Sequence, residues 1–323
     1  MIKPFAIIAG EPNSISSEII FKSWNLKKKY KHKPFFIIGN IRLLNLQLKK
    51  LKYKIKIKNI NNNLKINNLY GNELPVYDVN FNQKKAFEKI STKSNKYILK
   101  CFETALNLIN SKKIIGFINC PISKESLFKK KHQGITEFLS DKANVKGFET
   151  MLIYNKKLSV SPITTHIPLN EVSKKIKLDM IIKKVKSIDI FYKKILKKKA
   201  KFAILGLNPH NFSPTRKSIE KQVISKAIKN LMKKKIDVSG PISPDTSFVI
   251  YKKYKYDVLV GMYHDQVLTP FKALFGFNAI NITLGLPYIR ISPDHGVGTF
   301  IIGKKIADPT SLIESIKFFN LVK

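Results

Sequence analysis

Short runs of apolar residues alternate along the chain with longer stretches in which apolar residues recur every three or four positions. The short runs have the length of buried strands, and the longer stretches have the period of helices that bury one face. The predicted strands span 5–9, 35–39, 114–118, 151–154, 202–207, 258–260 and 279–283. The predicted helices span 16–30, 84–108, 172–196 and 219–232. This alternation predicts an α/β fold with a largely parallel sheet.

Individual residues refine one of these elements and predict two more. Asn170 is a candidate N-cap for the helix over 172–196. Asp308 followed by Pro309 predicts the start of a C-terminal helix, with the carboxylate as N-cap and the proline in the first helical position. Tyr53–Lys58 alternates lysine with other residues, which is typical of a strand at the edge of a sheet.

The chain has 323 residues and a net charge of +39, from 60 Lys and Arg against 21 Asp and Glu. This length allows two domains with a core each. A strong positive charge is typical of nucleic-acid binders, but arginine, which such proteins favour, occurs at only three positions. The lysines are spread over every segment beside abundant Asn and Ile. A chain-wide compositional bias explains the charge better than a binding patch, so we expect no specific nucleic-acid partner.

Membrane and secretion signals are missing from the pattern. No run of about 18 apolar residues is present, so we expect no transmembrane helix and no membrane partner. Phe5–Ala9 is too short for the apolar part of a signal peptide and is better interpreted as a strand. Cys101 and Cys120 lie in apolar surroundings without metal-ligand spacing, as buried thiols of cytosolic proteins do. These features predict a cytoplasmic protein.

Three of the six histidines follow a strand-like run at the point where it breaks into a turn: His166, His210 and His264. The carboxyl ends of parallel strands meet at one edge of a sheet, and three neutral imidazoles there can bind a divalent metal and leave one position open. The alternative is that each histidine only satisfies a local hydrogen bond. Because all three histidines follow a strand-like run in the same way, a metal site is favoured over this alternative. Asp265 could orient a ligand or move a proton, or it could simply shape its turn.

The segment 261–303 holds six of the 14 glycines and one of the few arginines, Arg290. Where nearly every cation is lysine, an arginine suggests a geometric need, such as bidentate binding of a phosphate or carboxylate. Lys272 offers a second cation, although a solvated surface lysine is an ordinary alternative. Asp294–Gly296 forms a turn that either lines a ligand or is only a turn. No G-x-G-x-x-G or Walker motif occurs, which argues against a standard Rossmann nucleotide site.

A series of short motifs runs in order over almost the whole chain. They are Gly10–Pro12, Cys120–Lys124, Gly134–Phe138, Thr164–Leu169, Gly206–His210, Gly240–Thr246, Met262–Gln266, Asn281–Arg290 and Asp294–Gly296. Together they resemble the 4-hydroxythreonine-4-phosphate dehydrogenase family of pyridoxal phosphate biosynthesis. The resemblance implies two α/β/α domains of the isocitrate/isopropylmalate dehydrogenase type with a cleft between them. The domains would comprise 1–125 plus 275–323, and 126–274.

The resemblance also implies the ligands and their residues. A divalent metal (zinc, magnesium or cobalt) would be bound by His166, His210 and His264. The phosphorylated amino acid substrate would be bound by Thr136, Lys272, Asn281 and Arg290. The cofactor would be NAD, with its adenosine half near Asp294, His295 and Gly296. The candidate catalytic residues are Asp245, Asp265 and Lys272. The family further implies a homodimer with the active site at its interface.

The implied reaction is metal-assisted oxidation of the C3 hydroxyl of 4-phosphooxy-L-threonine by NAD, followed by decarboxylation of the β-keto acid. The chain departs from the family at Ile135, where the family has histidine before Thr-Glu-Phe. Isoleucine cannot hydrogen-bond a phosphate, so the affinity drops, a nearby group such as His132 substitutes, or the substrate differs. Glycines usual in the family are also lost in 13–17 and 211–216.

Three alternatives stay open. The first is a paralogue that oxidises another phosphorylated hydroxy acid, such as a four-carbon sugar acid phosphate, which Ile135 keeps plausible. The second is a non-catalytic relative or basic binding protein that kept the fold. The third is a metal-dependent hydrolase, which differs from the dehydrogenases in needing no NAD.

Overall fold

The computed structural model describes residues 3–123, 127, 134–145, 147, 149–211 and 218–322. Lys124, His132 and residues 212–216, all mentioned above, lie outside the described residues. The chain divides into two compact units, a first unit of Met1–Phe138 with Pro287–Lys323 and a second unit of Leu139–Leu286. The sequence predicted the two boundaries between the units at 125/126 and 274/275. In the structure the second boundary lies at 286/287, so the segment with Asn281 belongs to the second unit and not to the first.

The described part of the first unit contains parallel strands in the order β3-β4-β2-β1-β5-β12. The strands are β1 (Phe5–Ile8), β2 (Phe35–Gly39), β3 (Ile57–Asn59), β4 (Leu74–Asp78), β5 (Gly116–Asn119) and β12 (Ile289–Pro293). Every residue of β1, β2 and β5 is buried, as expected for parallel strands covered on both faces. The predicted edge strand is present as β3, which is shorter than the predicted segment.

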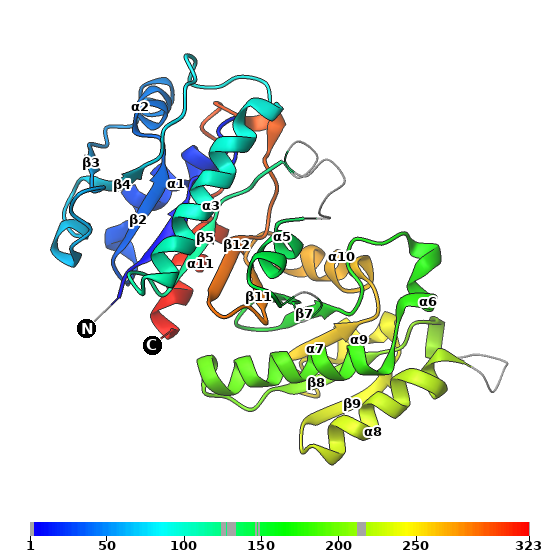
Figure 1. Ribbon diagram of the computed structural model, residues 1–323. Helices are drawn as coiled ribbons and strands as arrows, with labels where there is room; N and C mark the ends of the chain where they lie inside the picture. The colour runs from blue at the N-terminus through cyan, green and yellow to red at the C-terminus, as the bar shows by residue number, and fades with distance from the viewer. Residues whose placement is uncertain are drawn as a thin grey trace. The chain divides into compact units, whose positions relative to one another are not determined.

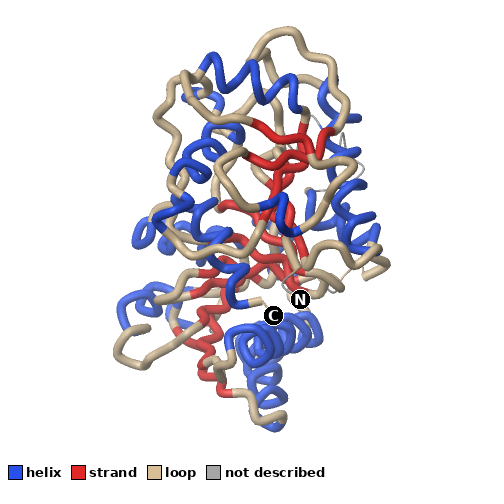
Figure 2. The backbone as a smooth tube through the Cα atoms, turned by 90° about the vertical axis from the view of Figure 1, so that its left-hand side faces the viewer, coloured by secondary structure: helices blue, strands red, loops and turns tan. Residues whose placement is uncertain are grey.

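Helices cover the strands of the first unit, and Figure 2 shows strands inside and helices outside. The helices are α1 (Ser16–Asn25), α2 (Ile41–Lys50), α3 (Asn95–Asn110) and α11 (Thr310–Phe318), and α5 (Ile135–Lys142) leads into the second unit. Helix α3 packs on β1, β2 and β5, whereas α1 packs against α2 and α11 (Figure 1). The predicted helix over 84–108 is therefore wrong in its first part, since α3 begins only at Asn95.

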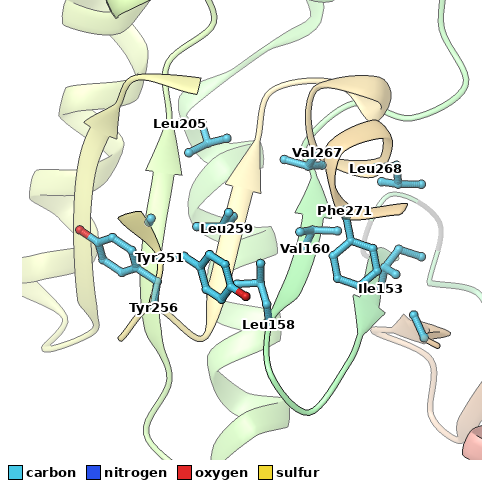
Figure 3. Packing of buried hydrophobic residues seen from close by; sticks show 12 residues of the cluster. Ile153, Leu158, Val160, Leu205, Tyr251, Tyr256, Leu259, Val267, Leu268 and Phe271 are labelled. Carbon is cyan, nitrogen blue, oxygen red and sulfur yellow. The ribbon is translucent and has the colours of Figure 1, made fainter. Parts of the chain in front are cut away.

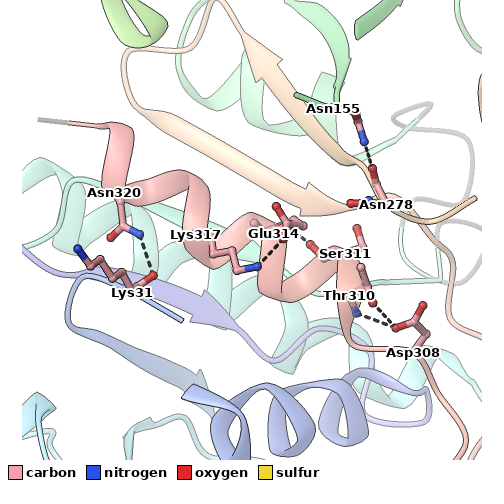
Figure 4. A network of polar contacts seen from close by, with 10 residues as sticks. Lys31, Asn155, Asn278, Asp308, Thr310, Ser311, Glu314, Lys317 and Asn320 are labelled. Atoms are coloured by element: carbon pink, nitrogen blue, oxygen red, sulfur yellow. Dashed lines mark hydrogen bonds and ion pairs between the residues drawn. The ribbon is translucent and has the colours of Figure 1, made fainter. Parts of the chain in front are cut away.

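The start of α11 differs slightly from its prediction. The Asp308 carboxylate accepts hydrogen bonds from the Thr310 backbone N–H at 2.9 Å and from the Thr310 hydroxyl at 2.6 Å (Figure 4). Pro309, and not Asp308, occupies the N-cap position. The Asp308 carboxylate thus stabilises the first turn of the helix from the position before the N-cap, and not from the N-cap itself as the sequence suggested.

The second unit has strands in the order β11-β6-β7-β10-β8-β9. The strands are β6 (Thr150–Tyr154), β7 (Ser159–Pro162), β8 (Lys201–Leu205), β9 (Asp237–Ile242), β10 (Val258–Gly261) and β11 (Ile280–Leu284). Strands β7, β10, β8 and β9 are parallel to one another, and β6 is antiparallel to both of its neighbours. The carboxyl ends of four adjacent strands therefore share one edge.

Two groups of helices pack on the second unit's strands. They are α6 (Val172–Lys175), α7 (Leu178–Phe191), α8 (Ser225–Lys233), α9 (Pro244–Ile250) and α10 (His264–Phe275). Helix α7 packs with α8, while α10 packs over β7 and β10 beside α9. Figure 3 shows α10 placing Val267, Leu268 and Phe271 against the strand residues Val160 and Leu259. This packing fixes α10 on the strands.

The predicted helix over 172–196 is interrupted. Helix α6 ends at Lys175, Ile176 is extended, and α7 begins at Leu178 with Lys177 as its N-cap. Asn170 lies in a short 3-10 turn and caps neither helix. None of the helices in the described ranges is long and apolar enough to cross a membrane.

Glu11 follows β1 and is 1% exposed. Its Oε1 accepts hydrogen bonds from the Asn13 backbone N–H at 3.3 Å and from the Ser94 hydroxyl at 3.2 Å, and burial raises its pKa from the ordinary 4.5. A raised carboxyl pKa means that the folded protein binds this proton more tightly than the unfolded chain does. The stability contributed by Glu11 is therefore complete below about pH 4.5 and is lost as the pH rises through the folded pKa.

Glu11→Gln should therefore gain stability relative to the wild type as the pH rises from about 4 to about 8, because the amide never ionises. Thermal denaturation of both proteins across this range measures the difference, at about 2–4 °C per kcal/mol for a unit of this size. Parallel melting curves at every pH would show that the buried carboxyl does not titrate in this window.

Candidate active site

The three histidines follow neighbouring strands of the second unit. His166 comes after β7, His210 after β8 and His264 after β10. Strand β10 lies between the other two and runs parallel to both, so all three residues are at the same edge. The rings of His166 and His264 have their centroids 5.8 Å apart.

Two carboxylates accompany these imidazoles. Asp245, near the start of α9, has its Oδ2 3.5 Å from the Nδ1 of His210. Asp265 has its Oδ1 2.6 Å from the Nδ1 of His264. The pKa of Asp245 is lowered mainly by the Ser243 hydroxyl, which donates to it at 2.7 Å. Both predicted catalytic carboxylates thus touch predicted metal ligands and can orient their rings.

The chemistry of this edge suits a divalent metal. Within the described ranges, no three His, Cys, Asp or Glu side chains lie close enough together to form a metal-binding group. The donors at the edge are nevertheless imidazole nitrogens and a carboxylate, which zinc and cobalt accept. The His210 side chain is 75% exposed, and its backbone is left-handed, with φ 52° and ψ 18°. The three histidines fit a metal by donor type.

Buried polar groups hold the turn that carries His210. Glu220, 2% exposed, accepts hydrogen bonds at its Oε1 from the backbone N–H groups of Leu207 and Asn208, at 3.2 and 2.9 Å. On the other side, Asn211 donates from Nδ2 to the Pro241 carbonyl at 2.9 Å. The roles of Glu220 and Asn211 were not predicted from the sequence. The only available signal was their closeness to the Asn-Pro-His motif.

Gly206 lies beneath this turn. A Cβ added there would meet the Oδ1 of Asn211 at 1.7 Å, so Gly206→Ala should displace Asn211 and break its bond to Pro241. We expect a cost of about 1–3 kcal/mol, the usual penalty for overpacking. Thermal denaturation checks this against Gly296→Ala, where an added Cβ meets nothing within 4 Å. A Gly206→Ala protein that melts with the wild type would show that the turn adapts freely.

Two predicted substrate residues belong to the second unit. Lys272 is half-buried on α10, with its Nζ 5.5 Å from the centroid of the Phe277 ring. Asn281 lies on β11, and its Oδ1 is buried without a hydrogen-bond partner among the residues that the structure describes. Buried polar atoms are almost always paired, so an unpaired carbonyl oxygen suits a ligand that brings a donor.

Arg290 and Thr136 belong to the first unit. Arg290, on β12, is 2% exposed and donates from Nε to the Oδ1 of Asn119 at 2.7 Å. Burial lowers its pKa to about 10, so the guanidinium stays charged at neutral pH. Thr136 is half-buried on α5, and Ile135 beside it is 5% exposed. Ile135 is thus packed in the interior.

The predicted cofactor residues follow β12 in the first unit. The Asp294 backbone N–H donates to the Ser311 hydroxyl at 2.8 Å, and the Nδ1 of His295 lies 3.1 Å from the Gly296 carbonyl oxygen. The Val297 carbonyl accepts from the Ile15 N–H at 3.1 Å, which joins this loop to the one after β1. Both loops lie at the carboxyl edge of a parallel sheet, where nucleotides commonly bind, so the residues fit the predicted role.

The fold is similar to that of isocitrate dehydrogenase from Methylococcus capsulatus, with a TM-score of 0.50 and 10% identity over 98% of this chain and 85% of that chain. At this identity the likeness concerns the fold alone. The fold is therefore of the isocitrate dehydrogenase type, as the sequence predicted.

Residues 31–319 match the family described as pyridoxal phosphate biosynthetic protein PdxA. A 4-hydroxythreonine-4-phosphate dehydrogenase from Sulfurihydrogenibium sp. is 38% identical over 100% of this chain and 99% of its own length. The crystal structure of the enzyme of that name from Klebsiella pneumoniae has a TM-score of 0.84 and 26% identity over 99% of this chain and 100% of that chain. The chain belongs to the PdxA family, and the predicted resemblance is confirmed.

Proposed function

We propose that the chain oxidises 4-phosphooxy-L-threonine with NAD to 2-amino-3-oxo-4-phosphooxybutanoate, which decarboxylates to 3-amino-2-oxopropyl phosphate, a step of pyridoxal phosphate biosynthesis. The name of the Sulfurihydrogenibium relative, similar over the full chain, supports this reaction. The observation that carries the proposal is the set of polar side chains at the carboxyl ends of four adjacent parallel strands: His166, His264, His210 and Asp245.

The three histidines would hold a zinc, magnesium or cobalt ion. When bound, such an ion stabilises negative charge on the substrate oxygen that loses its proton. Asp265 pairs with the Nδ1 of His264 and so leaves the Nε2 of that ring for a ligand. Asp245 is 56% exposed beside His210, and its lowered pKa keeps the carboxylate ionised at neutral pH, so it would orient the His210 ring by accepting a hydrogen bond from Nδ1.

The substrate carries a phosphate, a carboxylate and an amino group. Arg290 and Lys272 would bind its two anionic groups, because a buried guanidinium and a partly buried ammonium are suited to phosphate and carboxylate. The unpaired Oδ1 of Asn281 would accept a hydrogen bond from the amino group. Thr136 would contribute its hydroxyl, while Ile135 packs inside and takes no part.

NAD would accept the hydride, with its adenosine half near Asp294, His295 and Gly296. A homodimer is part of the proposal. It rests on the resemblance to the family. Cys101 and Cys120 are both buried free thiols, which supports a cytoplasmic location.

The test is NADH formation, followed by absorbance, with purified protein, 4-phosphooxy-L-threonine and added Zn²⁺, Mg²⁺ or Co²⁺. Metal-dependent turnover is expected. Turnover only with a four-carbon sugar acid phosphate would favour the paralogue. This alternative arises because the buried Ile135 cannot hydrogen-bond a phosphate. Release of inorganic phosphate without NAD would instead favour a metal-dependent hydrolase.

A further inference from the structure

A glutamine side chain joins two of the strand ends. The parallel pairing of β8 with β10 ends at Ile204 and Val260. Beyond this pair, the Oε1 of Gln266 accepts a hydrogen bond from the Met262 backbone N–H at 2.6 Å, and its Nε2 donates to the Gly206 carbonyl at 2.8 Å. The side-chain amide thus supplies one acceptor and one donor, as a further peptide group of the ladder would.

These bonds continue on both sides. The Met262 carbonyl accepts from the Thr164 hydroxyl at 2.8 Å and from the Thr164 N–H at 3.1 Å. The Gly206 N–H donates to the Ile242 carbonyl at 2.9 Å. We name this series, Thr164, Met262, Gln266, Gly206 and Ile242, the cross-strand row. It links the carboxyl ends of β7, β10, β8 and β9.

Each strand end in the cross-strand row leads within a few residues to a side chain of the candidate metal site. Thr164 precedes His166, Met262 precedes His264, and Gly206 begins the turn of His210. Ile242 is followed by Asp245. The separation of the strand ends therefore sets the separation of the imidazoles.

Gln266 is itself held firmly. It lies on α10, next to Val267 and Leu268, which are 0% and 4% exposed and pack into the core (Figure 3). A Cβ added at Gly261 would meet the Cγ1 of Val267 at 2.5 Å and the Oε1 of Gln266 at 2.9 Å, so the glycine leaves room for the amide. The amide therefore cannot shift without disturbing the packing of α10.

We propose that Gln266 is a positioning residue for the divalent metal: its side-chain amide fixes the spacing of the strand ends that lead to His210 and His264, from which the two imidazoles would reach a shared ion. This inference rests on the proposed function, since it takes these histidines as ligands. Gln266 touches neither imidazole through a described hydrogen bond, so it acts through the backbone of both turns.

The test is a Co²⁺ titration of the full-length protein, read from the visible absorption spectrum of the bound ion. Gln266→Met preserves the length of the side chain but removes the donor and the acceptor. We expect its Co²⁺ affinity to fall about 10–100-fold, with changed absorption bands, because residues that support metal ligands have effects of this size. Thr164→Val, which loses only the hydroxyl bond to Met262, should show a smaller fall.

Gln47→Met is the matched control. Gln47 is likewise a glutamine whose amide bonds to two backbone groups, from Nε2 to the carbonyls of Pro12 and Ala86 at 2.8 and 3.0 Å, but it is 2% exposed and belongs to the first unit. The Gln47→Met protein should lose thermal stability and keep its Co²⁺ affinity and spectrum.

Wild-type affinity in a folded Gln266→Met protein overturns the inference and leaves the proposed function standing. Equal losses in both methionine variants also overturn it, whereas a wild type that binds no Co²⁺ contradicts the inference and the proposed metal site together.

Discussion

Replacement of His210 by alanine should reduce metal-dependent NADH formation at least about 100-fold, since even groups that only support metal ligands change affinity or activity by 10–100-fold. His210 is a proposed ligand and its pairing with Asp245 is lost at the same time. Its side chain is 75% exposed, so the substitution removes little packing. The loss should therefore appear mainly in metal binding and turnover, and any fall in the melting temperature should come from the left-handed backbone at this position.

The left-handed backbone of His210 calls for a second variant. Alanine at φ 52° costs about 1–2 kcal/mol in conformational energy, whereas asparagine tolerates this region. His210→Asn should lose activity as His210→Ala does, while retaining the turn. His32→Ala serves as control, because His32 lies in the first unit, where its ring packs on Phe35 at 5.3 Å. Normal turnover in both His210 variants would exclude His210 as a ligand.

Arg290→Lys should raise the KM for the phosphorylated substrate by about 100-fold, the equivalent of about 2.7 kcal/mol. Lysine keeps a positive charge but loses the planar fork and the Nε donor that binds Asn119 at 2.7 Å. Asn119 is 2% exposed, so its Oδ1 would be left without this partner inside the protein. An unpaired buried acceptor costs about 1–3 kcal/mol, and the melting temperature should therefore fall as well.

Steady-state kinetics with the substrate varied at saturating NAD separates the two effects of Arg290→Lys. Arg42→Lys is the matched control, since Arg42 is an exposed arginine on α2 and should change neither KM nor stability. An unchanged KM together with a lower melting temperature would make Arg290 a structural residue only. A raised KM with an unchanged melting temperature would show that Asn119 finds another hydrogen-bond donor.

The sequence located most of the strands, including β10, and missed others such as β7, in which polar residues break the apolar run. Strand β10 is buried over its whole length, and its apolar run was predicted almost to the residue. Strand β7 was missed because Ser159 and Ser161 interrupt its apolar pattern. Both serines are 0% exposed, and they are paired inside with the Tyr192 hydroxyl and the Met151 carbonyl. Such pairing depends on contacts with other segments of the chain, which cannot be predicted from the periodicity of apolar residues.

Contacts between distant segments were also not predictable in the candidate site. The strand-end positions of the histidines followed from the local pattern of an apolar run and a turn. The groups that hold them did not, because Gln266 bonds to Gly206, 60 positions away, and Asn119 bonds to Arg290, 171 positions away. Nothing in the local sequence of a glutamine or an asparagine distinguishes such a bond from a solvated surface amide.

The first unit is discontinuous in the chain, and this sets an order of assembly during synthesis. Residues 139–286 leave the ribosome before β12, which pairs with β5 through Arg290 and Phe117. The second unit, with all three histidines, is therefore complete while the first still exposes the edge of β5. A nascent chain arrested there would present an open strand edge, which is a template for aggregation and a target for chaperones. The proposed metal ligands therefore lie in the unit whose chain is complete first, whereas the arginine proposed to bind substrate arrives with the last strand.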